Sequence, residues 1–374
     1  MNFKRNAAVL GVAAVGAMTL VACGSDDNSS SSGTTVNSAA SNATCEGKES
    51  LSAAGSSAQK NAMDEFVATY IAVCRDKGKD VKVAYNPTGS GDGRTQFIAE
   101  QIDFAGSDSA IKGDQAAAAK DRCAGGDAWN LPLVFGPVAI AYNLDGVTDL
   151  TLSGEVLAKI FSGAITNWND PAIAALNADA ALPDQKITPI VRSDSSGTTD
   201  NFQQYLTAAS NGVWTKGAGS DFVGGVGEGA KGSAGVSQAV AGSSGSITYV
   251  EKSFADQNKL AMAKIDSGAG AVELTEASAG KAIEGATFKA EGVGDLTLDL
   301  NSIYGTTEAG AYPIVLATYS IVCSTGYDAD TSAAVKSFLT SAANEGQANL
   351  AEQGYVPLPG TVQDKLNASI AAIA

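Results

Sequence analysis

The stretch "WNLPLVFGPVAIAYN", residues 129–143, is a continuous apolar run broken by Pro132, Gly136 and Pro137. Such a run is typical of a buried strand, and its breaks suit a strand that leaves one domain and enters another. A second run of the same character, "AYPIVLATYSIVC", occupies residues 311–323. The two runs therefore predict two domains that are joined by two crossing strands.

The length of the chain agrees with two domains, because residues 45–374 exceed what one compact core usually covers. The apolar content of 44% is ordinary, and the formal net charge is −16. That charge argues against nucleic acid or an anionic surface as a partner. It also makes an anionic ligand unexpected unless local groups hold it.

The N-terminus has the features of an export signal. Lys4 and Arg5 precede an uncharged run over residues 7–22, which is too short and too rich in alanine and glycine for a membrane span. We therefore expect a signal peptide at residues 1–22. The run ends in "LVAC", which resembles the lipobox of bacterial lipoproteins and makes Cys23 the expected lipidation site. An ordinary signal peptide that happens to end in cysteine is the alternative.

The segment after Cys23, "GSDDNSSSSGTTVNSAASNAT" at residues 24–44, contains almost no apolar side chains. Such a segment buries too little surface to offset the entropy of ordering, so a flexible tether is expected. We therefore predict a lipidated linker over residues 23–44, which holds the folded body on the outer face of the cell membrane.

Four of the five cysteines remain once Cys23 is set aside. In an exported protein they suggest two disulfides, with three possible connectivities. Cys45–Cys74 is favoured because Cys45 precedes a predicted strand and Cys74 ends the helix that runs back along it. Cys123–Cys323 is left by elimination. The cysteine spacings fit no metal site and the chain has no histidine, so neither a metal nor another cofactor is expected.

The first part of the body alternates between strand and helix patterns. The expected strands are 50–54, 81–87 and 102–109, and the expected helices are 58–74 and 91–101. This β-α-β-α-β order is typical of a parallel sheet with covering helices. Each strand ends in a small, hydroxyl-rich turn, and in open α/β sheets ligands bind beyond the carboxyl ends of the strands.

The later part of the chain is less regular. We expect a helix over residues 154–163, a strand over 187–192 and a helix over 199–209 with an apolar face. Residues 217–245 are rich in glycine and serine, and their structure is ambiguous. A helical tail over residues 333–355 is expected to return to the first domain.

The stretch "RSDSSGTT", residues 192–199, lies between the predicted strand and helix of this later part. Ser196, Gly197 and Thr198 would therefore stand at a helix N-terminus, where backbone N–H groups are unpaired and the dipole is positive. Arg192 adds a planar guanidinium that suits oxyanions. The stretch predicts a cradle for a tetrahedral oxyanion. A helix cap beside a solvated arginine is the simpler alternative.

A nucleophilic serine is disfavoured, because the chain has no histidine to act as its base and no G-x-S-x-G motif. The G-x-G-x-x-G match at residues 227–232 has no clear strand before it, so we interpret it as chance.

Asp108, at the end of a predicted strand, is unusual in an anion site because an ionised carboxylate can only accept hydrogen bonds. It becomes useful if the ligand carries a proton. Phosphate near neutral pH has at least one P–OH group whereas sulfate has none, so Asp108 would discriminate against sulfate. A carboxylate that merely caps a turn is the alternative.

These motifs resemble those of the phosphate-binding lipoprotein of the high-affinity phosphate ABC transporter, especially the actinobacterial type. The resemblance extends from about Leu51 to about Pro359. It rests on "AAGSSAQKNAMDEF", "NPTGSGDGR", "DFAGSDS", "IFSGAITNWNDPAIAALN", "VRSDSSGTT", "GSITYVEKSFADQNKLA" and "YPI" at 312–314. It implies an α/β protein with the type II periplasmic-binding-protein fold, in which two α/β lobes joined by two crossing strands close on phosphate.

The resemblance also implies a site. Phosphate would be held by Ser57, the backbone of Ala58, Ser90, Asp108, Arg192, Ser196, Gly197 and Thr198, with Asp194 holding Arg192 in place. The family often has Thr-Phe where this chain has Ser57 and Ala58, and a one-residue change of register makes Ser56 a further candidate. The implied lobes are residues 45–137 with 314–374, and residues 138–313, hinged near 136–141 and 314–319.

The function implied is a monomeric, non-enzymatic receptor that delivers phosphate to the permease and ATPase subunits of an ABC transporter. A phosphohydrolase on the same scaffold would need a base or a metal centre, and the sequence indicates neither. A receptor for another oxyanion or a small organic anion, with Arg192 as its clamp, is the other alternative. An added role as a surface antigen is compatible with either.

Overall fold

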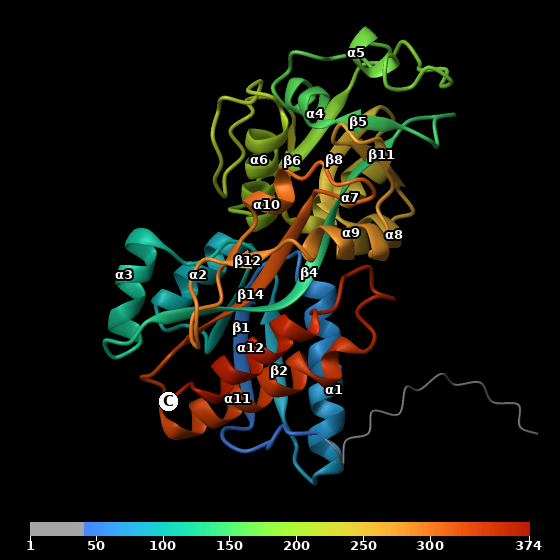
Figure 1. The fold of residues 1–374 in the computed structure, drawn as a ribbon. Coiled ribbons are helices and arrows are strands. Elements are labelled where there is room, and N and C mark those ends of the chain that lie inside the picture. Colours follow the sequence, from blue (N-terminus) through green and yellow to red (C-terminus); the bar gives the residue numbers. More distant parts are fainter. Residues whose placement is uncertain (1–40) are drawn as a thin grey trace, which may run out of the picture. The chain divides into compact units, whose positions relative to one another are not determined.

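The structure is a computed structural model that describes residues 41–374 (Figure 1). The predicted signal peptide, Cys23 and most of the predicted linker lie outside these residues. The last residues of the predicted linker, from Ser41, are packed on the body. Ala43 is fully buried, and Lys77 Nζ donates to the backbone carbonyls of Ser41 at 2.9 Å and Ala43 at 2.5 Å. The packed chain therefore begins a few residues before Cys45.

The β-α-β-α-β order predicted for the first part of the body is confirmed. The strands are β1 (Ser50–Gly55), β2 (Lys82–Asn86) and β3 (Phe104–Ser107), and the helices are α1 (Lys60–Asp76) and α2 (Ser90–Ile98). β1 lies between β2 and β3 and pairs with both in parallel. A further helix, α3 (Gly113–Arg122), follows β3 and was not predicted. The carboxyl ends of the three strands therefore point to the same edge of the sheet.

The large sheet continues from this part of the chain into the middle part, in the order β2-β1-β3-β14-β4-β8-β6-β7. Its remaining strands are β14 (Val315–Cys323), β4 (Ala128–Asn143), β8 (Ser246–Glu251), β6 (Thr188–Arg192) and β7 (Glu228–Ala230), and β9 (Ala261–Met262) also pairs with β4. β4 pairs with β14 as far as Pro137 and with β8 from Val138 onward. In Figure 1 this long strand passes from one half of the ribbon to the other. The change of partner falls where the lobe boundary is expected.

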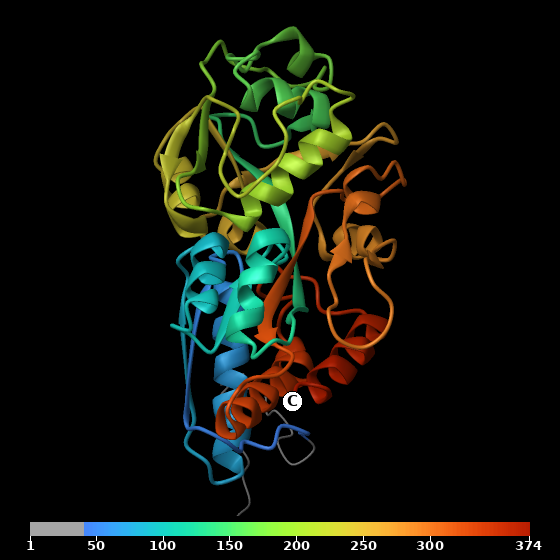
Figure 2. The ribbon, with the colours of Figure 1, turned by 90° about the vertical axis from the view of Figure 1, so that its left-hand side faces the viewer.

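The middle part of the chain carries most of the remaining helices and two small sheets (Figure 2). The helices are α4 (Gly154–Phe161), α5 (Pro171–Ala174), α6 (Gly197–Ala209), α7 (Gly232–Ala241), α8 (Lys252–Gln257), α9 (Glu276–Ile283) and α10 (Asn301–Tyr304). The small sheets contain β5 (Thr151–Ser153), β10 (Lys264–Asp266) and β11 (Ala271–Val272), and β12 (Thr287–Phe288) with β13 (Leu298–Asp299). The segment left ambiguous by the sequence contains β7 and α7.

The apolar face predicted for α6 is buried. Phe202, Tyr205 and Leu206 are fully covered, and Ala209 is half-buried at the helix end. Phe202 stacks on Tyr249 of β8 with 4.4 Å between ring centroids, and Phe161 of α4 meets Phe202 edge-on at 4.8 Å. Aromatic pairs of this kind add to the stabilisation from buried area. They fix α6 against the sheet, which matters because its N-terminus faces the candidate site.

The C-terminal part returns to the first part of the chain, as predicted, but not as one helix. The helix α11 (Ala329–Ala343) packs on α1, where Tyr70 meets Phe338 edge-on at 5.5 Å. The expectation that the helix continues to residue 355 is wrong. Asn344 leaves the helical region at φ −115° and ψ −86°, and only a short 3-10 turn, Glu345–Gln347, follows. A last helix, α12 (Gly360–Ala371), begins after Pro359.

The structure contains the disulfides Cys45–Cys74 and Cys123–Cys323, with Cα–Cα distances of 5.5 and 5.2 Å. The first ties the start of the body to α1. The second joins the end of α3 to the end of β14. Both pairings agree with those favoured by the sequence. Across residues 41–374 no helix has the length and apolar character that crossing a membrane requires.

Candidate functional site

Asp108 lies where the turns after β1, β2 and β3 meet, and its side chain is almost fully buried. Its Oδ1 accepts a hydrogen bond from Ser56 Oγ at 2.6 Å, and its Oδ2 accepts one from Ser90 Oγ at 3.0 Å. The backbone N–H of Asp108 donates to Ser90 Oγ at 3.1 Å. The convergence of hydroxyl-rich turns at the carboxyl edge of the sheet is therefore present, with a carboxylate at its centre.

Arg192 is the last residue of β6 and is also buried, with 4% of its surface exposed. Asp194 holds one side of the guanidinium, since Nε donates to Oδ1 at 2.8 Å and Nη2 to Oδ2 at 2.5 Å. The N–H of Gly232 donates to the same carboxylate at 2.9 Å. This is the supporting position expected for Asp194. Nη1 points away from it and is available to other partners.

Hydroxyl groups from two further elements surround Nη1 of Arg192. It lies 3.3 Å from Thr198 Oγ1 and 3.4 Å from Ser233 Oγ, which both accept from it. Ser233 Oγ also lies 3.0 Å from Ser57 Oγ, and the N–H of Ser233 donates to Ser57 Oγ at 3.0 Å. Ser233 therefore links the turn after β1 to the guanidinium of Arg192 by hydrogen bonds.

The N-terminus of α6 faces the turn that carries Asp108. Ser196 caps the helix, because its Oγ accepts from the N–H of Thr199 at 3.1 Å. Asn201 Nδ2 joins the two segments by donating to the carbonyl oxygens of Asp108 at 2.7 Å and Gly197 at 2.8 Å. The positive end of the helix dipole and its first N–H groups are thus directed at the same place as Arg192.

Tyr249 of β8 holds the two functional segments of the later part together. Its hydroxyl is 2.8 Å from Thr199 Oγ1 and accepts from the backbone N–H of Arg192 at 3.4 Å. Burial raises the pKa of Tyr249 to about 12, so it stays a neutral phenol that can both donate and accept. The packing of Phe202 on its ring fixes this bridge.

Burial is the largest influence on Asp108 and raises its pKa to about 7. The hydrogen bond from Ser56 opposes this rise, the charge of Glu251 adds to it, and Ser90 and Arg192 oppose it. A ligand hydroxyl that donates to the ionised carboxylate would favour the ionised form. Near neutral pH, Asp108 can therefore serve as an acceptor for a protonated ligand.

The hydrogen bonds distinguish the neighbouring candidates of the first turn. Ser56 donates to Asp108, and its Oγ also accepts from the N–H of Gln59 at 3.1 Å. Ser57 instead faces Ser233. Ala58 is fully buried, and its carbonyl oxygen accepts from the Tyr355 hydroxyl at 2.6 Å.

Two residues of the site were not identified from the sequence. Ser233 lies in the segment that looked ambiguous, because β7 has only three residues and gives no recognisable strand pattern. The glycine motif at 227–232, interpreted as chance, in fact spans this strand and the turn before α7. Glu251 ends β8 and accepts from Thr198 Oγ1 at 2.6 Å. The sequence feature that could have identified Glu251 is its position at the end of a buried strand.

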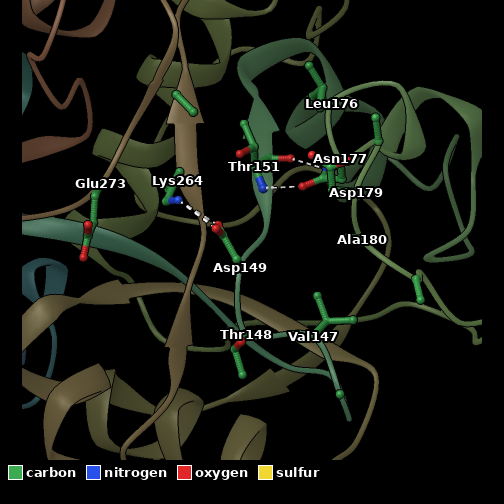
Figure 3. A pocket seen from close by; sticks show the side chains of 14 residues that line it. Val147, Thr148, Asp149, Thr151, Leu176, Asn177, Asp179, Ala180, Lys264 and Glu273 are labelled. Carbon is green, nitrogen blue, oxygen red and sulfur yellow. Dashed lines mark hydrogen bonds and ion pairs between the residues drawn. The ribbon is translucent and has the colours of Figure 1, made fainter.

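A separate pocket lies between residues 146–151, residues 176–181 and the strands β10 and β11 (Figure 3). It has a volume of about 760 Å³ and contains none of the residues of the Asp108–Arg192 group. Lys264 points into it, but its ammonium is paired with Asp149 at 2.9 Å. The pocket is open and lacks a second cation, so we do not assign it as the functional site.

The Asp108–Arg192 group has the donors and the acceptor that holding a small anion requires. Arg192, hydroxyl groups and a helix N-terminus supply donors from several directions, and Asp108 supplies an acceptor. The chain has no histidine, and residues 41–374 contain no cluster of carboxylates or cysteines arranged to bind a metal ion. We refer to this group as the cage, and it consists of Ser56, Ser57, Ser90, Asp108, Arg192, Thr198 and Ser233.

Comparison with known proteins supports the same interpretation. The model of the PBP superfamily domain matches residues 28–343. Phosphate-binding protein PstS 3 of Mycobacterium tuberculosis is 50% identical over 377 residues and covers 100% of both chains. PstS 2 of the same species is 48% identical with the same coverage. PstS of Pasteurella multocida is 35% identical over 77% of this chain and 81% of its own.

Solved structures share the fold. A high affinity periplasmic phosphate-binding protein, PfluDING, bound with phosphate, has a TM-score of 0.68 and 22% identity, over 86% of this chain and 93% of its own. A phosphate-binding protein from Stenotrophomonas maltophilia has a TM-score of 0.65 and 20% identity, over 86% and 94%. At these identities the likeness concerns the fold, which is the periplasmic-binding-protein fold expected from the sequence.

Proposed function

Because this chain belongs to the phosphate-binding proteins of ABC transporters, within the PBP superfamily, we propose that it binds inorganic phosphate in the cage between Asp108 and Arg192. It is a transport receptor and not an enzyme, as its relatives are phosphate-binding proteins of the same length. The observation that carries the assignment is that the buried carboxylate of Asp108 stands opposite the guanidinium of Arg192 and its neighbouring hydroxyl groups, which suits a protonated oxyanion.

The donors come from both sides of the cage. From the first part of the chain, Ser57, Ser90 and the backbone N–H of Ala58 would face the ligand, and Ser56 beside them donates to Asp108. From the later part, Arg192, Ser196, Gly197, Thr198 and Ser233 would complete the ring. Charge-assisted hydrogen bonds from Arg192 supply the strongest attraction. The net charge of −16 is then compatible with anion binding, because local donors rather than the overall field hold the ligand.

We further propose that the two lobes expected from the sequence, residues 45–137 with 314–374 and residues 138–313, close on phosphate. The partner change of β4 at Pro137 and Val138 supports a hinge there. The hydrogen bonds Ser57–Ser233 and Asn201–Asp108 connect residues of the two proposed lobes, as expected of a closed form. Closure around a ligand would create the surface that the permease recognises.

We also propose, from the sequence, that the protein is attached to the membrane. The signal-like run at residues 1–22 and Cys23 suggest a lipid anchor on the outer face of the cell membrane. A monomer that delivers phosphate to the permease and ATPase subunits of the transporter is the simplest assembly. Labelling with a palmitate analogue in cells would test the anchor, and Cys23→Ala should abolish the label.

Isothermal titration of phosphate-free protein tests the proposed function directly. We expect one phosphate per chain and little or no heat with sulfate. Sulfate lacks the proton that Asp108 accepts and would leave a buried carboxylate facing an anion. Absent phosphate binding would contradict the proposal, and preference for sulfate or a small carboxylate would favour a receptor for another anion.

The variant Asp108→Asn tests the role of the acceptor. The amide keeps the size of the side chain and can donate, so phosphate should still bind while the preference for phosphate over sulfate falls by about tenfold or more. Titration with both anions gives the ratio. Asp64→Asn, an exposed change on α1, serves as the matched control. An unchanged ratio in Asp108→Asn would show that another group excludes sulfate.

The variant Ser233→Ala tests a residue that the structure adds to the site. It removes the hydroxyl between Ser57 and Arg192, and the expected loss is about fivefold in phosphate affinity, corresponding to one hydrogen bond. Ser237→Ala removes a buried hydroxyl from the same helix and should leave the affinity unchanged. Equal affinities for the two variants would place Ser233 outside the site.

A further inference from the structure

The hairpin of β12 and β13, residues 287–299, lies within the sequence range proposed for the second lobe but is bound to the first lobe, residues 45–137 with 314–374. Asp295 Oδ1 in this hairpin accepts from the backbone N–H and from Nδ2 of Asn130, both at 2.7 Å. Asn130 belongs to the part of β4 that pairs with β14. The hairpin is therefore fastened to the first lobe.

Two further hydrogen bonds hold the hairpin in the same place. The N–H of Gly294 donates to Ser369 Oγ of α12 at 2.9 Å, and the N–H of Leu298 donates to the Tyr319 hydroxyl of β14 at 3.1 Å. In Figure 2 the orange segment that contains the hairpin extends to the red C-terminal helices. Across residues 41–374, the only hydrogen bonds from the hairpin to the second lobe go to Asn301, the first residue of α10.

Lifting the hairpin off the first lobe would be costly. Asn130 is almost fully buried, and its carbonyl oxygen accepts from the N–H of Leu296 at 3.1 Å. This carbonyl, the backbone N–H and the side-chain amide of Asn130 would all lose their partners in the hairpin, which destabilises buried polar groups. Leu296 and Leu298, which are also buried, would be returned to water. The hairpin should therefore stay on the first lobe when the lobes separate.

The helices on both sides of the hairpin are bound to the second lobe instead. In α9, before the hairpin, the carbonyl oxygen of Ser278 accepts from the N–H of Tyr312 at 2.9 Å. In α10, after the hairpin, the Tyr304 hydroxyl donates to Asn201 Oδ1 of α6. Three residues connect α9 to the hairpin, and one residue connects the hairpin to α10. An extended chain spans at most about 3.6 Å per residue, so these two joints can lengthen only a little.

We propose that the β12–β13 hairpin is a strap that moves with the first lobe and restrains its separation from the second. This inference rests on the lobe closure proposed above. The lobes are then connected by the two joints of the strap in addition to the crossing strands β4 and β14. Opening that stretched the joints would be resisted, so the axis of rotation passes close to them. The strap thereby favours the closed arrangement, in which the contacts on both lobes are made.

Distances between spin labels, measured by double electron–electron resonance, test this movement. The labels are attached to Val293→Cys in the strap, Lys82→Cys in the first lobe and Gln238→Cys in the second, which are exposed positions. Pairs of these changes are combined in a Cys23→Ala background, whose other cysteines are paired. When phosphate is added, the 82–238 and 238–293 distances should both change, whereas the 82–293 distance should stay constant.

The variant Asp295→Ala tests the restraint, because it removes the oxygen that accepts two hydrogen bonds from Asn130. In phosphate-free protein the 82–293 distances should then spread, and phosphate should dissociate about tenfold faster because the lobes open more readily. Asp295→Asn keeps an accepting oxygen and should behave as the wild type does. Glu291→Gln, an exposed change in the same hairpin, is the matched control.

Several results would overturn the proposal. One is an 82–293 distance that changes with phosphate, and another is a constant 238–293 distance while the 82–238 distance changes. A constant 82–238 distance in protein that binds phosphate would also do so, because no separation would need restraint. If calorimetry showed no phosphate binding, the proposed function would fail instead. The 82–293 distances of phosphate-free wild type and Asp295→Ala would still decide whether Asp295 holds the strap on the first lobe.

Discussion

Gly197→Ala should weaken phosphate binding by about a hundredfold, because it prevents the N-terminus of α6 from reaching the turn that carries Asp108. A Cβ atom at this position would lie 2.6 Å from Asp108 Cβ and 2.6 Å from Ser90 Oγ. Contacts this short force the two segments apart. Overpacking of this kind typically costs about 1–3 kcal/mol, and the upper figure corresponds to the expected loss.

The measurement is isothermal titration with phosphate, accompanied by thermal unfolding of the ligand-free protein. Gly280→Ala is the matched control, since it is also a helical glycine but its added Cβ would meet no atom within 4 Å. The control should bind as the wild type does. Wild-type affinity in Gly197→Ala would mean that the close approach of α6 and Asp108 is unnecessary for binding.

Removing the disulfide Cys123–Cys323 should cost more stability than removing Cys45–Cys74. The two bridges close loops of 200 and 29 residues. In the chain-entropy model, these lengths correspond to about 5 and about 3.5 kcal/mol of unfolding free energy. The longer bridge also joins segments that are far apart in the sequence, the end of α3 and the end of β14.

Urea unfolding of the two double serine variants measures the difference. We expect Cys123→Ser with Cys323→Ser to unfold at the lower urea concentration. Each folded variant should retain phosphate binding, because within residues 41–374 no cage residue is hydrogen-bonded to a cysteine of either bridge. A larger loss for Cys45→Ser with Cys74→Ser would show that local packing outweighs loop entropy here.

Much of the first part of the fold could be predicted from local patterns. The strands at 50–55, 82–86 and 104–107 and the helix at 60–76 repeat with clear periodicity, so their order and parallel pairing follow from general rules. The later part of the fold was harder to predict from such patterns. β7 has three residues, and the tail helix ends early because Asn344 leaves the helical region and Gly346 packs its backbone against Phe66.

Part of the candidate site could likewise be predicted from the sequence, and part could not. The residue types of "RSDSSGTT" and the turn ending in Asp108 indicated a donor ring and an acceptor, because those chemistries can be read from side chains alone. Ser233 and Glu251 could not be found in this way. They join the site through contacts with Ser57 and Thr198, which lie 176 and 53 residues away in the chain.

By itself, the sequence determined which chemical groups stand at the strand ends and the relationship to phosphate receptors, and it favoured one of three pairings of the cysteines, which the structure contains. The tertiary structure decided which hydrogen-bond partner each of those groups has. It directs Ser56 to Asp108, Ser57 to Ser233 and the proton of Thr198 to Glu251. The physical reason is that a hydroxyl donates only one proton, and its recipient depends on which distant segment the packing of β6, β7 and β8 brings within hydrogen-bonding distance.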